Sequence, residues 1–201
     1  MKEMQETRRV RMTKRLMKDA LLELLERKKL ANISVKELCE TADVHRTTFY
    51  LHYTDPSELL REIEQDFLNQ IPTPPEIIDE PSQEQLLEAT TAFFDYIKQN
   101  GCTIRILFSE SAQSSFSSRL VEYLCSGYIP VGEAAGAFPA RFLQLYIANG
   151  TLGMLREWVD RDFSMSSRRI AEMMYFLSRK LVASHDVPLQ AQTLQDGQAA
   201  H

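Results

Sequence analysis

The sequence has little of what disulfide-rich proteins, zinc proteins and most hydrolases need. Its three cysteines, Cys39, Cys102 and Cys125, are widely spaced and form no CxxC pair or Cys/His cluster. Neither a disulfide framework nor a zinc site is therefore expected, and the thiols should be reduced. Only four histidines occur, and no Ser-His-Asp, Cys-His or phosphate-loop signature accompanies them. We expect no enzyme activity, no cofactor and no bound metal.

Long apolar runs are also missing. No stretch approaches the roughly 18 apolar residues that a membrane helix needs. The N-terminal residues, MKEMQETRRVRMTKR, are charged, whereas a signal peptide has an apolar stretch there. The expectations are a cytoplasmic location and no membrane partner. With 44% hydrophobic and 25% charged residues among 201, the composition is typical of an ordered globular protein.

Glycine and proline are scarce, with 7 and 8 residues, and no series of strands is visible. Apolar residues recur at helical spacing through most of the chain, which predicts an all-α fold. Four of the prolines fall within residues 72–81, the best candidate for a linker. We predict a DNA-binding head at 1–54, a connecting helix at 55–72, a helical domain at 73–185 and a flexible tail at 186–201. Helices are expected at about 12–27, 34–42, 45–50, 56–71, 82–100, 102–110, 114–126, 139–160 and 166–184.

The charge is divided unequally along the chain. Residues 1–54 hold 12 Lys/Arg against 8 Asp/Glu, a net charge of +4, whereas residues 55–201 hold 11 against 20, a net charge of −9. A basic end on an acidic body is the arrangement expected of a head that meets nucleic-acid phosphates. A solvated, partly disordered tail would show the same basic run.

Capping signals mark the helices of the head. Ser34 and Glu37 form the pattern of a capping box, in which each side chain bonds the other residue's amide. Asp43 follows the apolar face of this second helix and tolerates the left-handed conformation of a sharp turn. Asp55 and Glu58 repeat the capping pattern, and Pro56 suits the first helical position.

A helix, a tight turn and a short helix with small polar and basic residues form the pattern of a helix-turn-helix. The second helix must be slim to enter a major groove about 12 Å wide. The stretch from Ile33 to Tyr53, followed by Ser57-Glu58-Leu59-Leu60, resembles the DNA-binding domain of the TetR family. The resemblance covers about residues 8–70. It implies a three-helix head, the start of helix 4 and a C-terminal helical domain that dimerises and often binds a small effector.

The resemblance also implies roles for residues of the head. It places Arg46 and Thr47 at base edges, Thr48 and Tyr50 at phosphates, and Tyr53 in the small core. Three positions depart from the family pattern. Asp43 replaces a glycine, His45 replaces a capping serine, and Pro56 replaces a phosphate-binding lysine. We expect the neutral His45 imidazole to accept an amide hydrogen bond. We expect the amides of helix 4 and the N-terminal basic arm to compensate for the missing lysine. The expected DNA-binding set is Arg46, Thr47, Thr48, Tyr50, His45, Ser34, Lys14, Arg9 and Arg11.

The C-terminal half resembles the family more weakly. The stretch from Asn149 to Trp158, followed by Phe163 and Ser166, looks like the last two helices, which in the family pair with their symmetry mates. Glycines in this stretch would permit close approach of helices, although a loosely packed helix would show them too. The expected dimer interface consists of Gly150, Gly153, Leu155, Trp158, Met173, Phe176 and Leu177.

An effector pocket is the remaining expectation. Aromatic side chains at helical spacing either line a cavity or form plain core, and the sequence leaves both open. The candidate lining consists of Phe93, Phe94, Phe108, Tyr123, Tyr146 and Asn149. The functional hypothesis is a repressor that binds a palindromic operator as a homodimer and is released by an unknown small molecule. The alternative is a regulator of the same fold that is controlled by a protein partner and has no small-molecule pocket.

Overall fold

A computed structural model describes residues 8–72, 82–112, 115–128 and 140–185. These residues form helices and no strands, so the predicted all-α fold is confirmed for the described chain. Of the linker expected at 72–81, residues 73–81 lie outside the described residues, as does the tail expected at 186–201.

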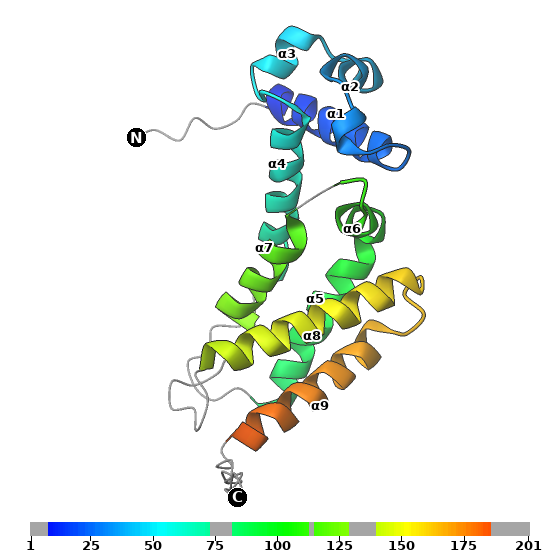
Figure 1. Ribbon diagram of the computed structural model, residues 1–201. Helices are drawn as coiled ribbons and strands as arrows, with labels where there is room; N and C mark the ends of the chain where they lie inside the picture. Colours follow the sequence, from blue (N-terminus) through cyan, green and yellow to red (C-terminus); the bar gives the residue numbers. More distant parts are fainter. Residues whose placement is uncertain (1–7, 73–81, 113–114, 129–139, 186–201) are drawn as a thin grey trace, which may run out of the picture.

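Three helices form the head, at the top of Figure 1. They are α1 (Arg8–Leu25), α2 (Val35–Ala42) and α3 (Arg46–Tyr50), with a short 3-10 turn at Leu30–Asn32 before α2. Because α1 has its apolar residues at helical spacing, it buries one face, against α2 and α4. This face consists of Met17, Ala20, Leu21, Leu24 and Leu25.

The α4 helix (Pro56–Asn69) leaves the head and runs into the body. The body contains α5 (Gln83–Gln99), α6 (Gly101–Phe108), α7 (Phe116–Tyr123), a π-helical turn at Leu124–Tyr128, α8 (Ala140–Asp160) and α9 (Ser167–His185). The α9 helix packs along α5, whereas α7 lies between α4 and α8. The α8 and α9 helices run side by side on the outside of the body (Figure 1).

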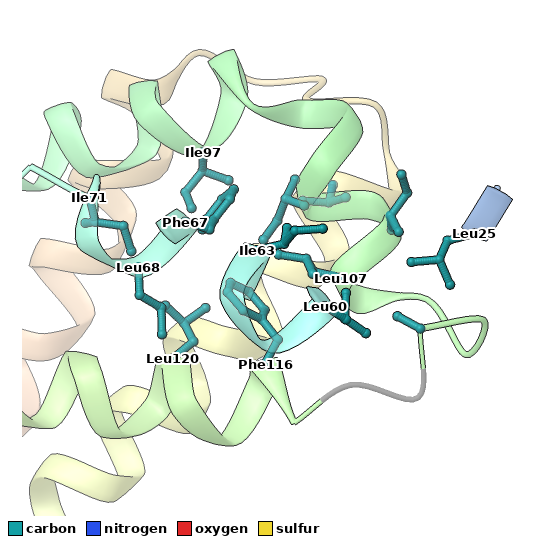
Figure 2. Packing of buried hydrophobic residues seen from close by; sticks show 14 of the residues in the cluster. Leu25, Leu60, Ile63, Phe67, Leu68, Ile71, Ile97, Leu107, Phe116 and Leu120 are labelled. Carbon is teal, nitrogen blue, oxygen red and sulfur yellow. The ribbon is translucent and has the colours of Figure 1, made fainter. Parts of the chain in front are cut away.

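The apolar face of α4 is the centre of the core that joins head and body. Figure 2 shows it beside residues of three body helices, Ile97 of α5, Leu107 of α6, and Phe116 and Leu120 of α7. Each large apolar side chain buried there contributes about 1.5–3 kcal/mol relative to exposure. The core is continuous with the head through Leu25 of α1. On the α4 side it consists of Leu60, Ile63, Phe67, Leu68 and Ile71.

A backbone contact adds to this connection. The amide of Leu30, in the turn before α2, donates to the carbonyl of Ser111, which follows α6, at 2.8 Å. The head therefore rests on the body through α4, through the contact of α1 with α6 and through this hydrogen bond.

Candidate nucleic-acid interface

The turn between α2 and α3 sets the angle of the second helix. Asp43 adopts the left-handed conformation, with φ 51° and ψ 47°, and its amide donates to the carbonyls of Cys39 and Glu40. Ser34 begins α2, and its hydroxyl accepts from the Glu37 amide at 3.2 Å. Asp can adopt this conformation because its short polar side chain tolerates positive φ. The prediction of a sharp turn at Asp43 is confirmed.

Only half of the predicted capping box at Ser34 is present. The Glu37 carboxylate accepts from the Lys28 ammonium at 2.5 Å instead of returning to the Ser34 amide. Lys28 lies in the segment that leads from α1 to α2, so this ion pair joins that segment to α2. A cation close enough to pair with a carboxylate forms a stronger hydrogen bond than a neutral amide does.

The α3 helix shows one face to solvent and buries the other. Phe49 and Tyr53 are buried, and their ring centroids lie 5.7 Å apart. Arg46, Thr47 and Tyr50 are exposed on the other side. The Phe49 ring meets the Tyr50 ring edge to face at 5.7 Å, and Tyr50 is exposed over 60% of its surface.

Two further residues lie beside this exposed face, one in α3 and one directly after it. Thr48, which the family pattern places at a phosphate, is half-buried at the rim of this face. Leu51 directly follows α3 and is exposed over 79% of its surface. Leu51 is not among the DNA-binding residues expected from the sequence. Its spacing of four residues from Thr47, which puts both on one helix face, is the signal that would have found it.

His45 is the N-cap of α3 and is exposed. The expectation that its imidazole accepts an amide hydrogen bond is corrected, because no such bond forms with the amides of α3. The His45 carbonyl already accepts from the Thr48 amide at 2.9 Å and from the Phe49 amide at 3.1 Å. The first turn is thus closed by backbone alone.

The N-terminus of α4 is occupied by acidic side chains. Asp55 Oδ1 accepts from the amides of Ser57 at 2.7 Å and Glu58 at 2.9 Å. Glu58 Oε2 accepts from the Thr54 amide at 2.7 Å and from its hydroxyl at 2.8 Å. The expectation that these amides would bind phosphate is corrected, since Asp55 already uses two of them. Glu58 caps Thr54 rather than Asp55, so this capping box also differs from the predicted one.

These hydrogen bonds keep both carboxylates ionised. The bond from the Glu58 amide lowers the pKa of Asp55, and the bond from the Thr54 amide lowers the pKa of Glu58. Where the family pattern has a cation, this chain therefore presents two negative charges. This end of α4 is therefore unfavourable for binding a phosphate.

The basic residues of α1 divide into two groups. Arg9 and Arg11 are exposed and remain candidates for phosphate contacts. Lys14 and Lys18 lie against α4, where Lys18 Nζ is 2.7 Å from Glu62 and 2.5 Å from Asp66. Burial lowers the pKa of Lys18, but hydrogen bonds to the two carboxylates outweigh it and raise that pKa.

Lys14 is the member of the predicted DNA-binding set that the structure places differently. Its ammonium lies 3.5 Å from Glu62 Oε1 and 5.8 Å from the centroid of the Tyr53 ring. Because α1 and α4 bring acidic and basic side chains together, Lys14 joins the head to α4. Its expected phosphate contact stays a prediction beside this interhelical contact.

The predicted dimer residues fall on two different faces of α8 and α9. Gly150 and Gly153 face open space, since a Cβ added at either would meet no atom of the described chain within 4 Å. Met173, Phe176 and Leu177 of α9 are exposed, Phe176 over 57% of its surface. A groove of about 770 Å³ lies beside Gly150, with apolar walls that include Leu145, Tyr146, Met154, Met174 and Leu181.

Leu155 and Trp158 do not belong to this face. Both are buried in the protomer's own core, and the Trp158 ring packs edge to face on Phe94 at 5.5 Å and Phe163 at 4.9 Å. The indole N–H donates to the Met165 carbonyl at 3.1 Å. Their expected place in a dimer interface is corrected, because they lie on the opposite side of α8 from the glycines.

The six predicted pocket residues do not surround one cavity. Phe93 and Phe94 are buried and pack edge to face at 5.2 Å. Phe108 is half-buried against Phe116, with the Arg156 guanidinium 4.7 Å from its ring.

The remaining members of that set lie elsewhere. Tyr123 is half-buried, and burial raises the pKa of its hydroxyl. Tyr146 and Asn149 are exposed in the α8–α9 groove, where the Asn149 amide donates to the Leu145 carbonyl at 2.8 Å. The alternative that these aromatic residues are mostly plain core agrees better with their positions, apart from Tyr146.

The part of the chain that the structure describes shows no group of three His, Cys, Asp or Glu side chains placed to hold a metal ion. Cys39, Cys102 and Cys125 are free thiols. None of the described helices is long and apolar enough to cross a membrane.

Comparison with known proteins gives a family match in the C-terminal half of the chain. A family described as the transcriptional regulator C-terminal region matches residues 84–180. No curated protein matches the sequence.

Solved structures match almost the whole chain. A TetR transcriptional regulator from Streptococcus agalactiae is 21% identical with a TM-score of 0.65, over 85% of this chain and 96% of that one. NalD, the secondary repressor of the MexAB-OprM multidrug efflux pump in Pseudomonas aeruginosa, is 16% identical with a TM-score of 0.60, over 87% and 97%. The dihydroxyacetone kinase operon activator DhaS is 19% identical with a TM-score of 0.57, over 87% and 98%. At these identities the likeness establishes the fold.

Proposed function

Since the chain has the fold of the TetR-family transcriptional regulators and matches a regulator C-terminal region at residues 84–180, we propose that it binds a palindromic DNA operator as a homodimer. In this proposal α3 enters the major groove of each half-site. The two copies of α3 in the dimer would lie about 34 Å apart, one helical turn of DNA.

The observation that carries the proposal is the exposed face of α3. Arg46 offers a planar fork of donors that suits the O6 and N7 atoms of a guanine, and Thr47 offers a short hydroxyl beside it. Both stand on a helix whose buried side is anchored by Phe49. A rigid helix with short and basic exposed side chains is the kind of surface that reads base edges.

Phosphate contacts are assigned to groups around that face. Thr48 and Tyr50 carry hydroxyls at its rim, and Arg9 and Arg11 lie exposed at the start of α1.

Ser34 and His45 border the same turn and stay in the proposed set, although the Ser34 hydroxyl already caps α2. With Asp55 and Glu58 ionised at the start of α4, binding depends on the arginines, and we expect a steep loss of affinity with salt.

Homodimerisation is assigned to the outer face of α8 and α9. Several large apolar side chains are exposed there, among them Phe142, Tyr146, Phe176 and Leu177. A patch of this kind on one protomer marks an interaction surface. Without a Cβ at Gly150 and Gly153, the backbone of α8 can approach a second copy closely.

The mode of regulation has two candidates. Release of a repressor by a small molecule is the first, and it needs an effector site in the body. Control by a protein partner is the second, and the close packing of Phe93, Phe94 and Trp158 in the core favours it. The sign of regulation is proposed as repression, with activation as the alternative.

Selection of bound fragments from sheared genomic DNA tests the proposal. An enriched palindrome for the wild-type protein, and loss of that palindrome for Phe176→Glu with folding retained, would support a DNA-binding dimer. Adding cell-extract metabolites to the same selection separates the two modes of regulation, since only a small-molecule effector would release the palindrome. No enriched sequence would contradict the proposed function.

A further inference from the structure

Leu51 is a large apolar side chain at the surface that α3 presents. Its exposed fraction, 79%, is the highest among the exposed large apolar residues of the described chain. It continues the helix, with φ −72° and ψ −20°, and its amide donates to the Thr47 carbonyl at 3.2 Å. The position of Leu51 is therefore as well defined as that of α3 itself.

Helix geometry places Leu51 on the same face as the polar residues. At about 100° per residue, Arg46, Tyr50, Thr47 and Leu51 follow one another around an arc of about 140°. Phe49 fills the opposite, buried side. Leu51 thus lies at the edge of the exposed face, next to Thr47 and away from Arg46.

The chemistry of the side chain limits what it can recognise. Leucine has no hydrogen-bonding group, whereas the base edges in the major groove present donors, acceptors and a single kind of apolar group, the C5-methyl of thymine. A leucine beside the base-reading residues is complementary to that methyl. A phosphate is charged and hydrated, so a contact with it would bring this apolar side chain no favourable interaction.

We infer that Leu51 is a specificity-determining residue that contacts the C5-methyl group of a thymine in each operator half-site. The inference rests on the proposed function, because it requires α3 to lie in the major groove. It adds an apolar contact to the hydrogen bonds of Arg46 and Thr47. The preferred half-site should then contain a thymine beside the bases that those two residues read.

Operators in which one symmetric pair of thymines is replaced by deoxyuridine test this inference, because the replacement removes only the methyl. The wild-type full-length protein should bind one such operator about fourfold more weakly per half-site, the factor that burial of a single methyl corresponds to. Leu51→Ala should bind the thymine operator more weakly and show no further loss with deoxyuridine. Its melting temperature should match that of the wild type, because Leu51 is exposed.

Leu16→Ala is the matched control, since Leu16 is an exposed leucine of the head on α1, outside the face of α3. This variant should keep the full response to deoxyuridine. An unchanged response to deoxyuridine in Leu51→Ala would overturn the inference and leave the proposed function standing. If the wild-type protein selects no operator at all, both are overturned.

Discussion

At the residue scale, the exposed side chains of α3 differ in the group that each offers to DNA. Arg46 ends in a guanidinium that can bond two acceptors of one base, whereas Tyr50, which is also exposed, ends in a hydroxyl. A base contact distinguishes sequences and a phosphate contact does not. Substitutions at the two positions should therefore change binding in different ways.

Arg46→Ala should cost about 1–3 kcal/mol of binding free energy to the preferred operator and relax the preference at one base pair, because a bidentate contact to guanine is lost. Tyr50→Phe is the matched variant. It should weaken binding by about the same factor for every operator sequence, because a phosphate contact does not distinguish bases. Both changes are measured by titrating single-base operator variants at fixed salt. If Arg46→Ala leaves the base preference unchanged, Arg46 contacts phosphate instead.

A second prediction concerns Asp55, whose carboxylate caps α4. Its pKa in the folded state lies below the unfolded value of about 3.9. The carboxylate therefore stabilises the fold above about pH 4, and this stabilisation is lost as the pH falls through the lower folded-state pKa. Asp55→Asn keeps a good N-cap but does not titrate. The free energy of unfolding should thus fall less between pH 7 and pH 3 in Asp55→Asn than in the wild type.

Urea unfolding at the two pH values measures this difference. Asp55→Ala is the control for the cap itself and should lose about 1 kcal/mol at pH 7. Equal pH dependence of the wild type and Asp55→Asn would show that the Asp55 carboxylate does not stabilise the fold.

At the scale of single elements, the start of α6 depends on a glycine. A Cβ at Gly101 would lie 2.8 Å from Cε2 of Phe163, whose ring also packs on Trp158. Gly153 lies within α8 and has open space around it. Alanine should therefore lower the free energy of unfolding at Gly101 and raise it at Gly153.

Gly101→Ala should lower the free energy of unfolding by about 1–3 kcal/mol, because the Phe163 ring must move to admit the methyl group. Gly153→Ala, measured on dilute monomer, should raise it by up to about 1 kcal/mol, since alanine favours the helix. Chemical denaturation of the two variants measures both values. Loss of stability in both would contradict the open space at Gly153.

At the scale of the whole molecule, one buried ion pair joins the connecting helix to the body. Glu64 of α4 is 1% exposed, and its carboxylate accepts from Arg119 of α7 at 2.8 Å and from Ser115 at 3.3 Å. Arg119 also donates to the side chain of Gln65. This cluster stands beside the apolar contact of Phe67 with Phe116.

Arg119→Ala should lower the free energy of unfolding by about 3 kcal/mol, because the Glu64 carboxylate would stay buried without its cation. The double variant Glu64→Leu/Arg119→Met should be more stable than Arg119→Ala, since no buried charge remains. Denaturant unfolding of the three proteins provides the comparison. A change below about 1 kcal/mol in Arg119→Ala would mean that water reaches the carboxylate.

Much of the fold could be predicted because the signals are local. The left-handed Asp43, the Ser34 cap and the helix starts at Pro56 and Ser82 each depend on a few neighbouring residues. The face that α3 exposes follows from the helical period in the same way. Leu51 lay within reach of that reasoning, through its spacing from Thr47.

The partners of charged side chains could not be predicted in this way. Lys14 faces Glu62, 48 residues away in sequence, and Arg119 faces Glu64, 55 residues away. Which groups remain available to a phosphate depends on such pairs. The position of each cation relative to the acidic face of α4 follows only from the packing of α1 on that helix.

By itself the sequence determined the helices, the turn and the helix-turn-helix pattern of the head, because hydrogen bonds and caps within helices span only a few residues. Only the tertiary structure decided that Trp158 and Leu155 turn into the core while Gly150 and Phe176 remain exposed. The α8 helix has apolar residues around much of its surface, so its own pattern does not select the buried face. Contacts with α5, α6 and α7, which are distant in sequence, select it.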